Sequence, residues 1–100
     1  MGFTQIIIRQ MLRSEALSER IHELSEKLQG LFPQVSLCRV VVESEGSQRK
    51  GRPYLVSVTV RLPGSEIVAD RHQNEDVYVA LRDAFAAAEN QLGVPERLAA

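Results

Sequence analysis

The apolar residues of this 100-residue chain change their spacing repeatedly, and each change falls at residues that favour turns. A helix buries one stripe of residues spaced three and four apart, whereas a half-buried strand alternates apolar and polar residues. A chain that switches between these two periods has to combine helices with a sheet. The spacing therefore predicts an α+β protein.

Four segments have the alternation or the β-branched composition of strands, with turn residues between them: residues 4–9, 35–43, 54–62 and 66–71. The alternation in the second segment places Cys38, Val40 and Val42 on one face. The third alternates most clearly, with Val56, Val58 and Val60 on one face. These strands are expected to turn one face toward a core.

The first predicted helix begins after Ser14, whose hydroxyl can accept a hydrogen bond from a free N–H group of the first turn. It is expected to end at Gly30 and Pro33, because glycine tolerates the left-handed conformation after a helix and proline cannot continue one. Its predicted apolar stripe comprises Leu17, Ile21, Leu24, Leu28 and Leu31, and its predicted solvent face carries Glu19, Glu23, Glu26 and Lys27.

The second predicted helix is capped by Asn74 or Asp76 and is expected to end at Gly93 and Pro95. Its apolar stripe comprises Val77, Leu81, Ala84, Phe85, Ala88 and Leu92. Residues 96–100 beyond it are expected to form a flexible tail.

The predicted order is strand, helix, strand, strand, strand, helix. A right-handed crossover makes the first two strands parallel, and short connections make the later strands antiparallel. Each helix has one apolar stripe, so both must cover the same sheet face to form one core. The prediction is a two-layer β-α-β-β-β-α domain over residues 1–95, with a four-stranded mixed sheet and two helices on one face.

The charge, the cysteine count and the length of the apolar runs argue against several classes of protein. Lys and Arg total 12 against 13 Asp and Glu, which gives a net charge of −1 and argues against a strongly cationic binder of nucleic acid or membranes. The single cysteine, Cys38, cannot form an internal disulfide. The apolar runs are shorter than the roughly 20 residues of a membrane span, and the N-terminus does not resemble a signal peptide. We therefore expect a cytoplasmic protein that does not bind membranes.

The sequence contains no recognised catalytic motif. One cysteine and two scattered histidines, His22 and His72, lack the spacing of a metal site, and Cys38 among apolar strand residues is typical of a small buried side chain. Glu43 and Glu45 are better explained as a solvated strand end than as paired catalytic carboxylates. We expect no enzymatic activity, no cofactor, no metal and no small-molecule substrate.

Basic residues suggest binding instead. Arg49, Lys50 and Arg52 concentrate positive charge in a polar loop, a weak signal by itself because such loops are common. Arg9, Arg39 and Arg61 belong to three different predicted strands. If these strands are adjacent, the three side chains would form a cationic row on the open sheet and meet several phosphates at once. The alternative, of equal weight, is that they pair with acids such as Glu43 and keep an exposed sheet soluble.

Further candidates lie near the second helix. Arg71 and His72 follow the fourth strand and could contact a phosphate or ribose, or simply form a polar strand exit. Arg82 stands beside Asp83 and is better explained as an ordinary exposed charge. Tyr54 and Tyr78 could stack on bases, although half-buried packing with a surface hydroxyl is the more usual role.

The second half of the sequence resembles the hibernation-promoting factor and ribosome-associated inhibitor family, also described as ribosomal subunit interface proteins. The resemblance is carried by a strand that ends in Leu-Pro-Gly at residues 62–64, a short strand, and then Asp-Val-Tyr-Val-Ala-Leu-Arg-Asp-Ala-Phe at residues 76–85. The first half agrees more loosely, through residues 14–17, 27–28 and 38–43. The match spans nearly the whole chain and has the element order derived above.

This resemblance implies a protein of the small ribosomal subunit that occupies the channel of mRNA and tRNA, silences idle ribosomes during stress and performs no chemistry. The positions that match the basic contacts of the family are Lys50, Arg52, Arg71, His72 and Arg82, to which the charge pattern adds Arg9, Arg39, Arg61 and Arg49. We expect these residues to bind ribosomal RNA.

The chain departs from the family in its charge. Typical members are basic, whereas here the second helix lacks a basic end and Glu15, Glu19, Glu23 and Glu26 make the first helix acidic. Fewer cations predict an affinity for RNA that is lower and falls quickly with salt. The alternative is a protein-interaction module on the same fold that has lost strong RNA binding. Such a module could form a weak homodimer through an edge strand, or through Ile7, Leu37, Val41 and Leu55 on the open face.

Overall fold

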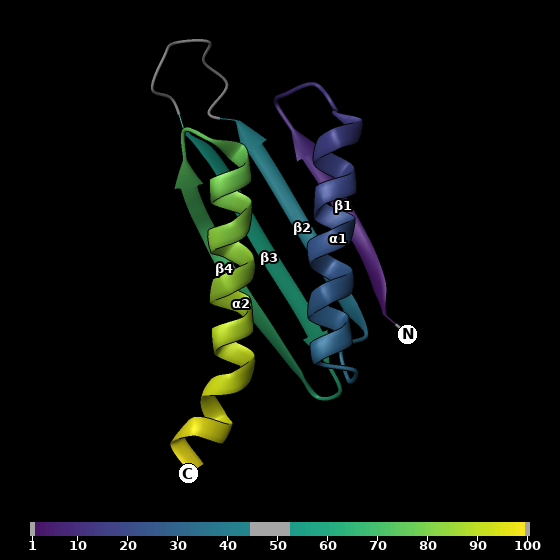
Figure 1. The fold of residues 1–100 in the computed structure, drawn as a ribbon, viewed down its shortest axis with the longest axis vertical. Coiled ribbons are helices and arrows are strands. Elements are labelled where there is room, and N and C mark those ends of the chain that lie inside the picture. The colour runs from purple at the N-terminus through teal and green to yellow at the C-terminus, as the bar shows by residue number, and fades with distance from the viewer. Residues whose placement is uncertain (1, 45–52, 100) are drawn as a thin grey trace.

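The computed structural model describes residues 2–44 and 53–99. Its elements are β1 (Phe3–Arg9), α1 (Glu15–Leu31), β2 (Leu37–Ser44), β3 (Tyr54–Leu62), β4 (Ser65–Asn74) and α2 (Val77–Ala99). The strands form one sheet in the order β1-β2-β3-β4, and both helices cover the same face of it (Figure 1). The predicted α+β fold and its element order are confirmed.

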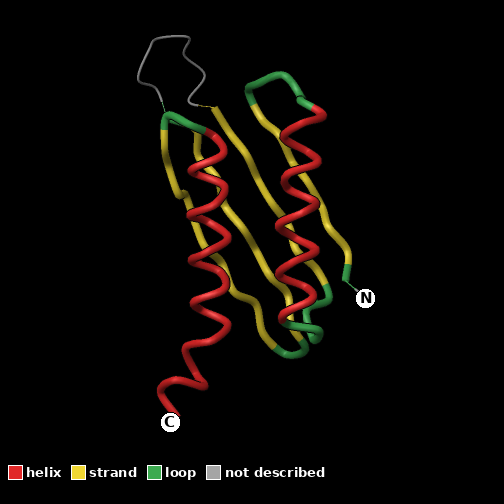
Figure 2. Tube along the Cα trace, viewed as in Figure 1, coloured by secondary structure: helices red, strands yellow, loops and turns green. Residues whose placement is uncertain are grey.

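The strand directions follow from the connections. β1 and β2 are parallel and are joined through α1, whereas β2–β3 and β3–β4 are antiparallel. Consequently β1, β2 and β4 all finish at the end of the sheet where α1 and α2 begin (Figure 2). We call this the helix-start end. It gathers the last residues of three strands and the first turns of two helices.

The core lies between the sheet and the helices and is built from the predicted alternation. Alternate residues in the middle of β2 and β3 are buried, and both helices contribute the stripes expected of them except for Leu31. The fully enclosed side chains include Cys38, Val40, Val42, Val56, Val58 and Val60 from the sheet and Leu17, Ile21, Leu28, Leu81 and Ala84 from the helices. The faces of the strands were thus predicted correctly.

A small polar cluster fastens β1 to α1. Ser25 is fully buried on the inner side of α1, and its hydroxyl lies 2.7 Å from the Thr4 hydroxyl of β1. The Gln29 amide donates to both oxygens, at 3.0 and 3.2 Å. Beside the cluster, a Cβ at Gly2 would lie 2.6 Å from Gln29 Oε1 and 2.8 Å from the Val35 carbonyl oxygen, so this close approach needs glycine. The start of the edge strand is therefore fixed in place.

The ends of the helices differ from the prediction. In α1, Ser14 is the predicted N-cap and accepts from the Leu17 N–H at 3.3 Å. The helix continues through Gly30 to Leu31, because the Phe32 N–H still bonds the Leu28 carbonyl and no left-handed residue is needed. Leu31, predicted to be part of the stripe, is 57% exposed, while Phe32 packs against the core. The helix thus ends between Gly30 and Pro33 as predicted, but Gly30 lies inside it and does not supply a left-handed end.

α2 also extends further than predicted. Asp76 caps it by accepting from the Tyr78 N–H at 2.9 Å, and Asn74 accepts from the Asp76 N–H at 2.9 Å, so both proposed capping residues take part. The helix does not stop at Gly93 and Pro95 but runs to Ala99, and its last turns bend away from the sheet (Figure 1). A proline inside a helix removes one backbone hydrogen bond and favours such a bend without having to end the helix.

Candidate nucleic-acid interface

The second face of the sheet is covered by neither helix. We call it the open face. Most of its side chains are half-buried by their neighbours or exposed, and they mix apolar, hydroxyl and charged groups. It comprises Phe3, Gln5, Ile7 and Arg9 of β1, Leu37, Arg39, Val41 and Glu43 of β2, Leu55, Ser57, Thr59 and Arg61 of β3, and Glu66, Val68, Asp70 and Arg71 of β4.

The three strand arginines do share the open face, on adjacent strands, but they do not form one row. Arg9 is paired in register with Glu43, Arg39 with Gln5 and Thr59, and Arg61 with Leu37. From strand geometry, Arg39 and Arg61 are diagonal neighbours about 8 Å apart, whereas Arg9 lies about 14 Å from Arg39. The prediction of a single cationic row is therefore wrong, because the strand register places each arginine in a different cross-strand row.

Arg39 and Arg61 differ in their partners. Arg39 Nε donates to Gln5 Oε1 at 2.8 Å, so its charge is oriented by a neutral amide. Arg61 Nη2 lies 3.5 Å from Glu66 Oε2, and both side chains are about half exposed (52% and 48%). Exposed ion pairs contribute only about 0–1 kcal/mol, so Arg61 can exchange Glu66 for a phosphate at little cost.

Arg71 stands in a β-bulge of β4. The pairing between β3 and β4 shifts between Val56 and Val58, so that Asp70 and Arg71 both lie opposite Ser57. Arg71 has a left-handed backbone with φ of 53°, which is unusual for a residue other than glycine. The Ser57 hydroxyl donates to Asp70 Oδ1 at 2.9 Å and accepts from the Arg71 N–H at 3.0 Å. One hydroxyl thus holds both residues of the bulge.

The bulge borders a shallow depression of about 290 Å³ on the open face. Two cations, Arg9 and Arg71, and two carboxylates, Glu43 and Asp70, line it. Val41, Leu55, Ser57, Thr59 and Val68 complete the lining. Such a surface can meet a phosphate with its guanidinium groups and hydroxyl or amino donors with its carboxylates, as the nucleotides of RNA require.

His72 does not join Arg71 at this depression. It is paired in register with Val56, which is buried on the helix-covered face, and His72 is accordingly half-buried there. Tyr54 lies on the same side, opposite Asn74, and is half-buried as expected. The bulge therefore separates two neighbours that the sequence suggested as one contact.

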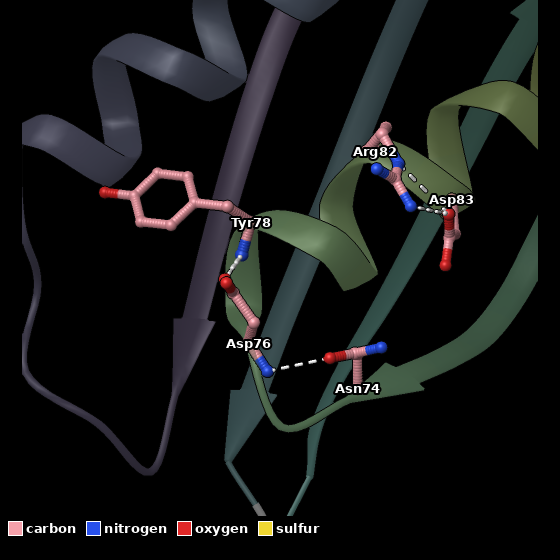
Figure 3. Close-up of polar contacts among 5 residues, drawn as sticks. All are labelled: Asn74, Asp76, Tyr78, Arg82 and Asp83. Atoms are coloured by element: carbon pink, nitrogen blue, oxygen red, sulfur yellow. Dashed lines mark hydrogen bonds and ion pairs between the residues drawn. The ribbon is translucent and has the colours of Figure 1, made fainter.

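Arg82 and Tyr78 lie in the first turns of α2 and point in different directions (Figure 3). Arg82 Nη2 lies 3.3 Å from Asp83 Oδ1, and the Arg82 side chain is 68% exposed. The Tyr78 ring is directed away from this pair and is 44% exposed, more than the half-buried packing that was expected. Both side chains are accessible to a partner at the helix-start end.

Lys50, Arg52 and Arg49 lie outside the described residues. The flanks of their segment are Ser44, at the end of β2, and Pro53, just before β3. These flanks belong to the helix-start end, as do Arg9, Arg71 and the first turns of α2. Among the described positions assigned to RNA binding, Arg9, Arg71 and Arg82 lie at this end, whereas Arg39 and Arg61 lie toward the other end of the open face.

The single cysteine, Cys38, lies in the hydrophobic core. Burial raises the pKa of the Cys38 thiol, while its hydrogen bond with Ser25 acts in the opposite direction, and the sulfur is enclosed in the core. Residues 2–44 and 53–99 hold no cluster of three metal-ligating side chains. No helix within these ranges is long and apolar enough to cross a membrane.

Sequence reasoning missed the part played by Ser57, Asp70 and Glu66. Ser57 organises the bulge through its hydroxyl, which bonds both Asp70 and Arg71. A signal was present: the core-facing residues of β4 are spaced by two from Ile67 to Ala69 and by three from Ala69 to His72. An extra residue in an alternating pattern is the mark of a bulge.

Comparison with known proteins agrees with this architecture. The family profile described as sigma 54 modulation protein / S30EA ribosomal protein matches residues 4–93. A search of curated protein sequences returns no significant match.

Two solved structures share the fold. The first, a ribosomal subunit interface protein from Coxiella burnetii, has a TM-score of 0.78 and 21% identity, covering 94% of this chain and 97% of that one. The second, the N-terminal domain of Protein Y from Thermus thermophilus, has a TM-score of 0.74 and 20% identity, covering 91% and 94%. At these identities the structures establish the fold, and the profile match over residues 4–93 establishes the kinship. The chain belongs to the sigma 54 modulation protein / S30EA ribosomal protein family, as the sequence resemblance predicted.

Proposed function

We propose that this protein binds the RNA of the small ribosomal subunit and inhibits translation by occupying the channel of mRNA and tRNA in idle ribosomes. The observation that carries the proposal is the family match over residues 4–93, on a chain whose fold agrees with a ribosomal subunit interface protein from another organism. The proposed action is non-catalytic and takes place in the cytoplasm during stress.

The chemistry of the open face and the helix-start end supports this proposal. Competing with tRNA requires a rigid body whose cations meet phosphates, and no bond has to be made or broken. Arg9 and Arg71 line the depression on the sheet, while Arg39 is held by the neutral Gln5. The first turn of α2, where the helix dipole favours anions, lies at the same end as Arg9 and Arg71. These observations support the assignment of contacts to Arg71, Arg82, Arg9, Arg39 and Arg61. The assignment of Lys50, Arg52, Arg49 and His72 rests on the family resemblance and the charge pattern of the sequence alone.

The net charge of −1 limits the strength of this binding. Few phosphates can be neutralised at once, so the affinity should be low even at low salt, and its logarithm should fall with only a small slope as salt rises. The acidic side chains of α1, including Glu19, Glu23 and Glu26, are exposed on the helix layer, away from the open face. We therefore place the open face, and not α1, against the RNA.

Gradient sedimentation and cell-free translation test the proposal together. The purified protein should migrate with isolated small subunits at low salt and should lower translation in proportion to the ribosomes bound. Protein that stays at the top of the gradient, with translation unchanged, would contradict it.

The alternative function is a protein-interaction module that has lost strong RNA binding. Two observations favour it: Arg61 is paired with Glu66, and Arg82 with Asp83. An electrophoretic shift assay with fragments of ribosomal RNA separates the two functions, because the alternative predicts no shift at any salt concentration.

A further inference from the structure

The two edges of the sheet, β4 and β1, differ in how they are protected against pairing with a further strand. The outer edge of β4 is interrupted by the bulge at Asp70 and Arg71, and Gln91 Nε2 of α2 donates to the Val68 carbonyl oxygen at 3.1 Å. Bulges and covering side chains are the usual means of stopping further strand pairing. β4 therefore has a closed edge.

The edge of β1 has no such protection. All seven residues, Phe3 to Arg9, pair with β2 without a bulge. The Phe3 N–H bonds the Ser36 carbonyl on the β2 side, so by alternation the N–H and C=O groups of Thr4, Ile6 and Ile8 point outward. In the described part of the chain no hydrogen bond is recorded that covers them. An unpaired row of this kind is a template for another strand.

The strand is also held ready to pair. Gly2, together with the cluster of Thr4, Ser25 and Gln29, fixes the inner side of β1 against α1. An edge fixed in advance loses little conformational freedom when a partner strand binds. Along the outer margin of the sheet β1 remains uncovered by a further strand (Figure 1).

We propose that β1 pairs with β1 of a second copy of this chain, antiparallel about a two-fold axis at Ile6, which joins the two sheets. The outward groups lie on even-numbered residues, so the hydrogen-bonded pairs must join even to even. The register centred on Ile6 satisfies this rule and uses the whole strand. It places Thr4 opposite Ile8 and Gln5 opposite Ile7 of the other copy.

The same register places Phe3 of each copy opposite Arg9 of the other, so that one such pair lies at each end of the paired strands on the open face. Phe3 is 77% exposed in the monomer and has no packing role there, and Arg9 is exposed at the other end of the strand. A guanidinium group over an aromatic ring is a favourable contact. Self-complementarity at the ends of the strand, together with apolar residues between them, is why we choose a second copy as the partner. The association goes beyond the proposed ribosomal function and needs no ribosome.

Sedimentation velocity without RNA, from micromolar to millimolar protein, tests this inference. The untagged protein should pass with increasing concentration from a mass of 11.2 kDa to twice that mass. Phe3→Arg places like charges opposite each other at both ends and should weaken the dimer by about tenfold or more. Arg9→Glu in addition turns each end into an ion pair and should restore the dimer. A protein that stays monomeric at every concentration would overturn the proposal.

Val68→Lys is the matched control, since Val68 is an exposed apolar residue of the open face on the opposite edge. It should leave the dimer unchanged, and an equal loss there would show that the open face, not the β1 edge, associates. A dimer that Phe3→Arg leaves intact, or that the double variant fails to restore, would also refute the register. Circular dichroism of each variant confirms that the fold is retained, which is expected because Phe3 and Arg9 are exposed.

Discussion

The two faces of the same sheet show how this chain divides its residues between folding and binding. On the helix-covered face, alternating residues of β2 and β3 are fully buried and almost all apolar. On the open face, which neither helix covers, the same strands carry Arg39, Glu43, Ser57 and Thr59 beside apolar neighbours. The covered face specifies the structure, whereas the open face tolerates charge and carries the proposed RNA contacts.

The largest expected effect belongs to the covered face. Leu81→Ala removes a fully buried side chain and should lower the free energy of unfolding by about 2–5 kcal/mol. Thr59→Ala on the open face should change it by less than about 0.5 kcal/mol. Chemical denaturation measures both values. Equal losses would show that the open face is part of the core, and the contrast between the faces would be lost.

Charge reversal at Lys50 and Arg52 should affect binding and leave stability unchanged. Lys50→Glu with Arg52→Glu should weaken binding to small subunits by about tenfold or more, or about 1.4 kcal/mol, because phosphate contacts become repulsive. The matched control, Arg20→Glu with Lys27→Glu, makes the same change of charge at exposed positions of α1. If both double variants bind equally poorly, net charge alone controls binding and the assigned site is wrong.

The bulge on the open face allows a finer test. Ser57→Ala removes the hydroxyl that holds Asp70 and Arg71, so it should cost about 1 kcal/mol of stability. It should also reduce RNA binding, since the position of Arg71 depends on that hydroxyl. Ser65→Ala, which removes an exposed hydroxyl at the start of β4 outside the depression, supplies the control in both measurements. A variant that binds RNA like the wild type would remove Arg71 from the interface.

The smallest effect concerns Cys38 on the covered face. Its pKa is raised by burial above the ordinary value of 9.0, so the folded protein keeps the thiol protonated when the unfolded chain has lost its proton. This contribution to stability is complete below pH 9 and is lost as the pH rises further, because the unfolded state then binds fewer protons. Denaturation at several alkaline pH values should show a decline that is steeper for the wild type than for Cys38→Ala. Parallel curves would mean that the thiol is not protected from ionisation.

Most of the fold followed from the sequence because periodicity reports burial directly. The alternation of Val56, Val58 and Val60 and the capping by Ser14 and Asp76 are local features, and the structure reproduces them. The ends of the helices were less predictable. Gly30 lies inside α1 and Pro95 inside α2, since a glycine or proline permits a helix to end but does not force it to.

The candidate site was harder to predict because it depends on register. The sequence placed Arg9, Arg39 and Arg61 on one face correctly, but only the pairing of the strands shows that they lie in three different rows. The bulge moved Arg71 to the open face and left His72 on the covered one. Partners such as Glu66 and Gln5 were likewise fixed by neighbouring strands. Long-range pairing is information that local patterns do not contain.

The affinity of the purified protein for isolated small subunits, measured across a series of salt concentrations, tests the central claim most directly. The account predicts binding at low salt and a logarithm of the affinity that falls linearly with the logarithm of salt concentration. The slope should be small because few cations contact phosphate. Absence of binding at the lowest salt concentration, or an affinity that does not depend on salt, would contradict it.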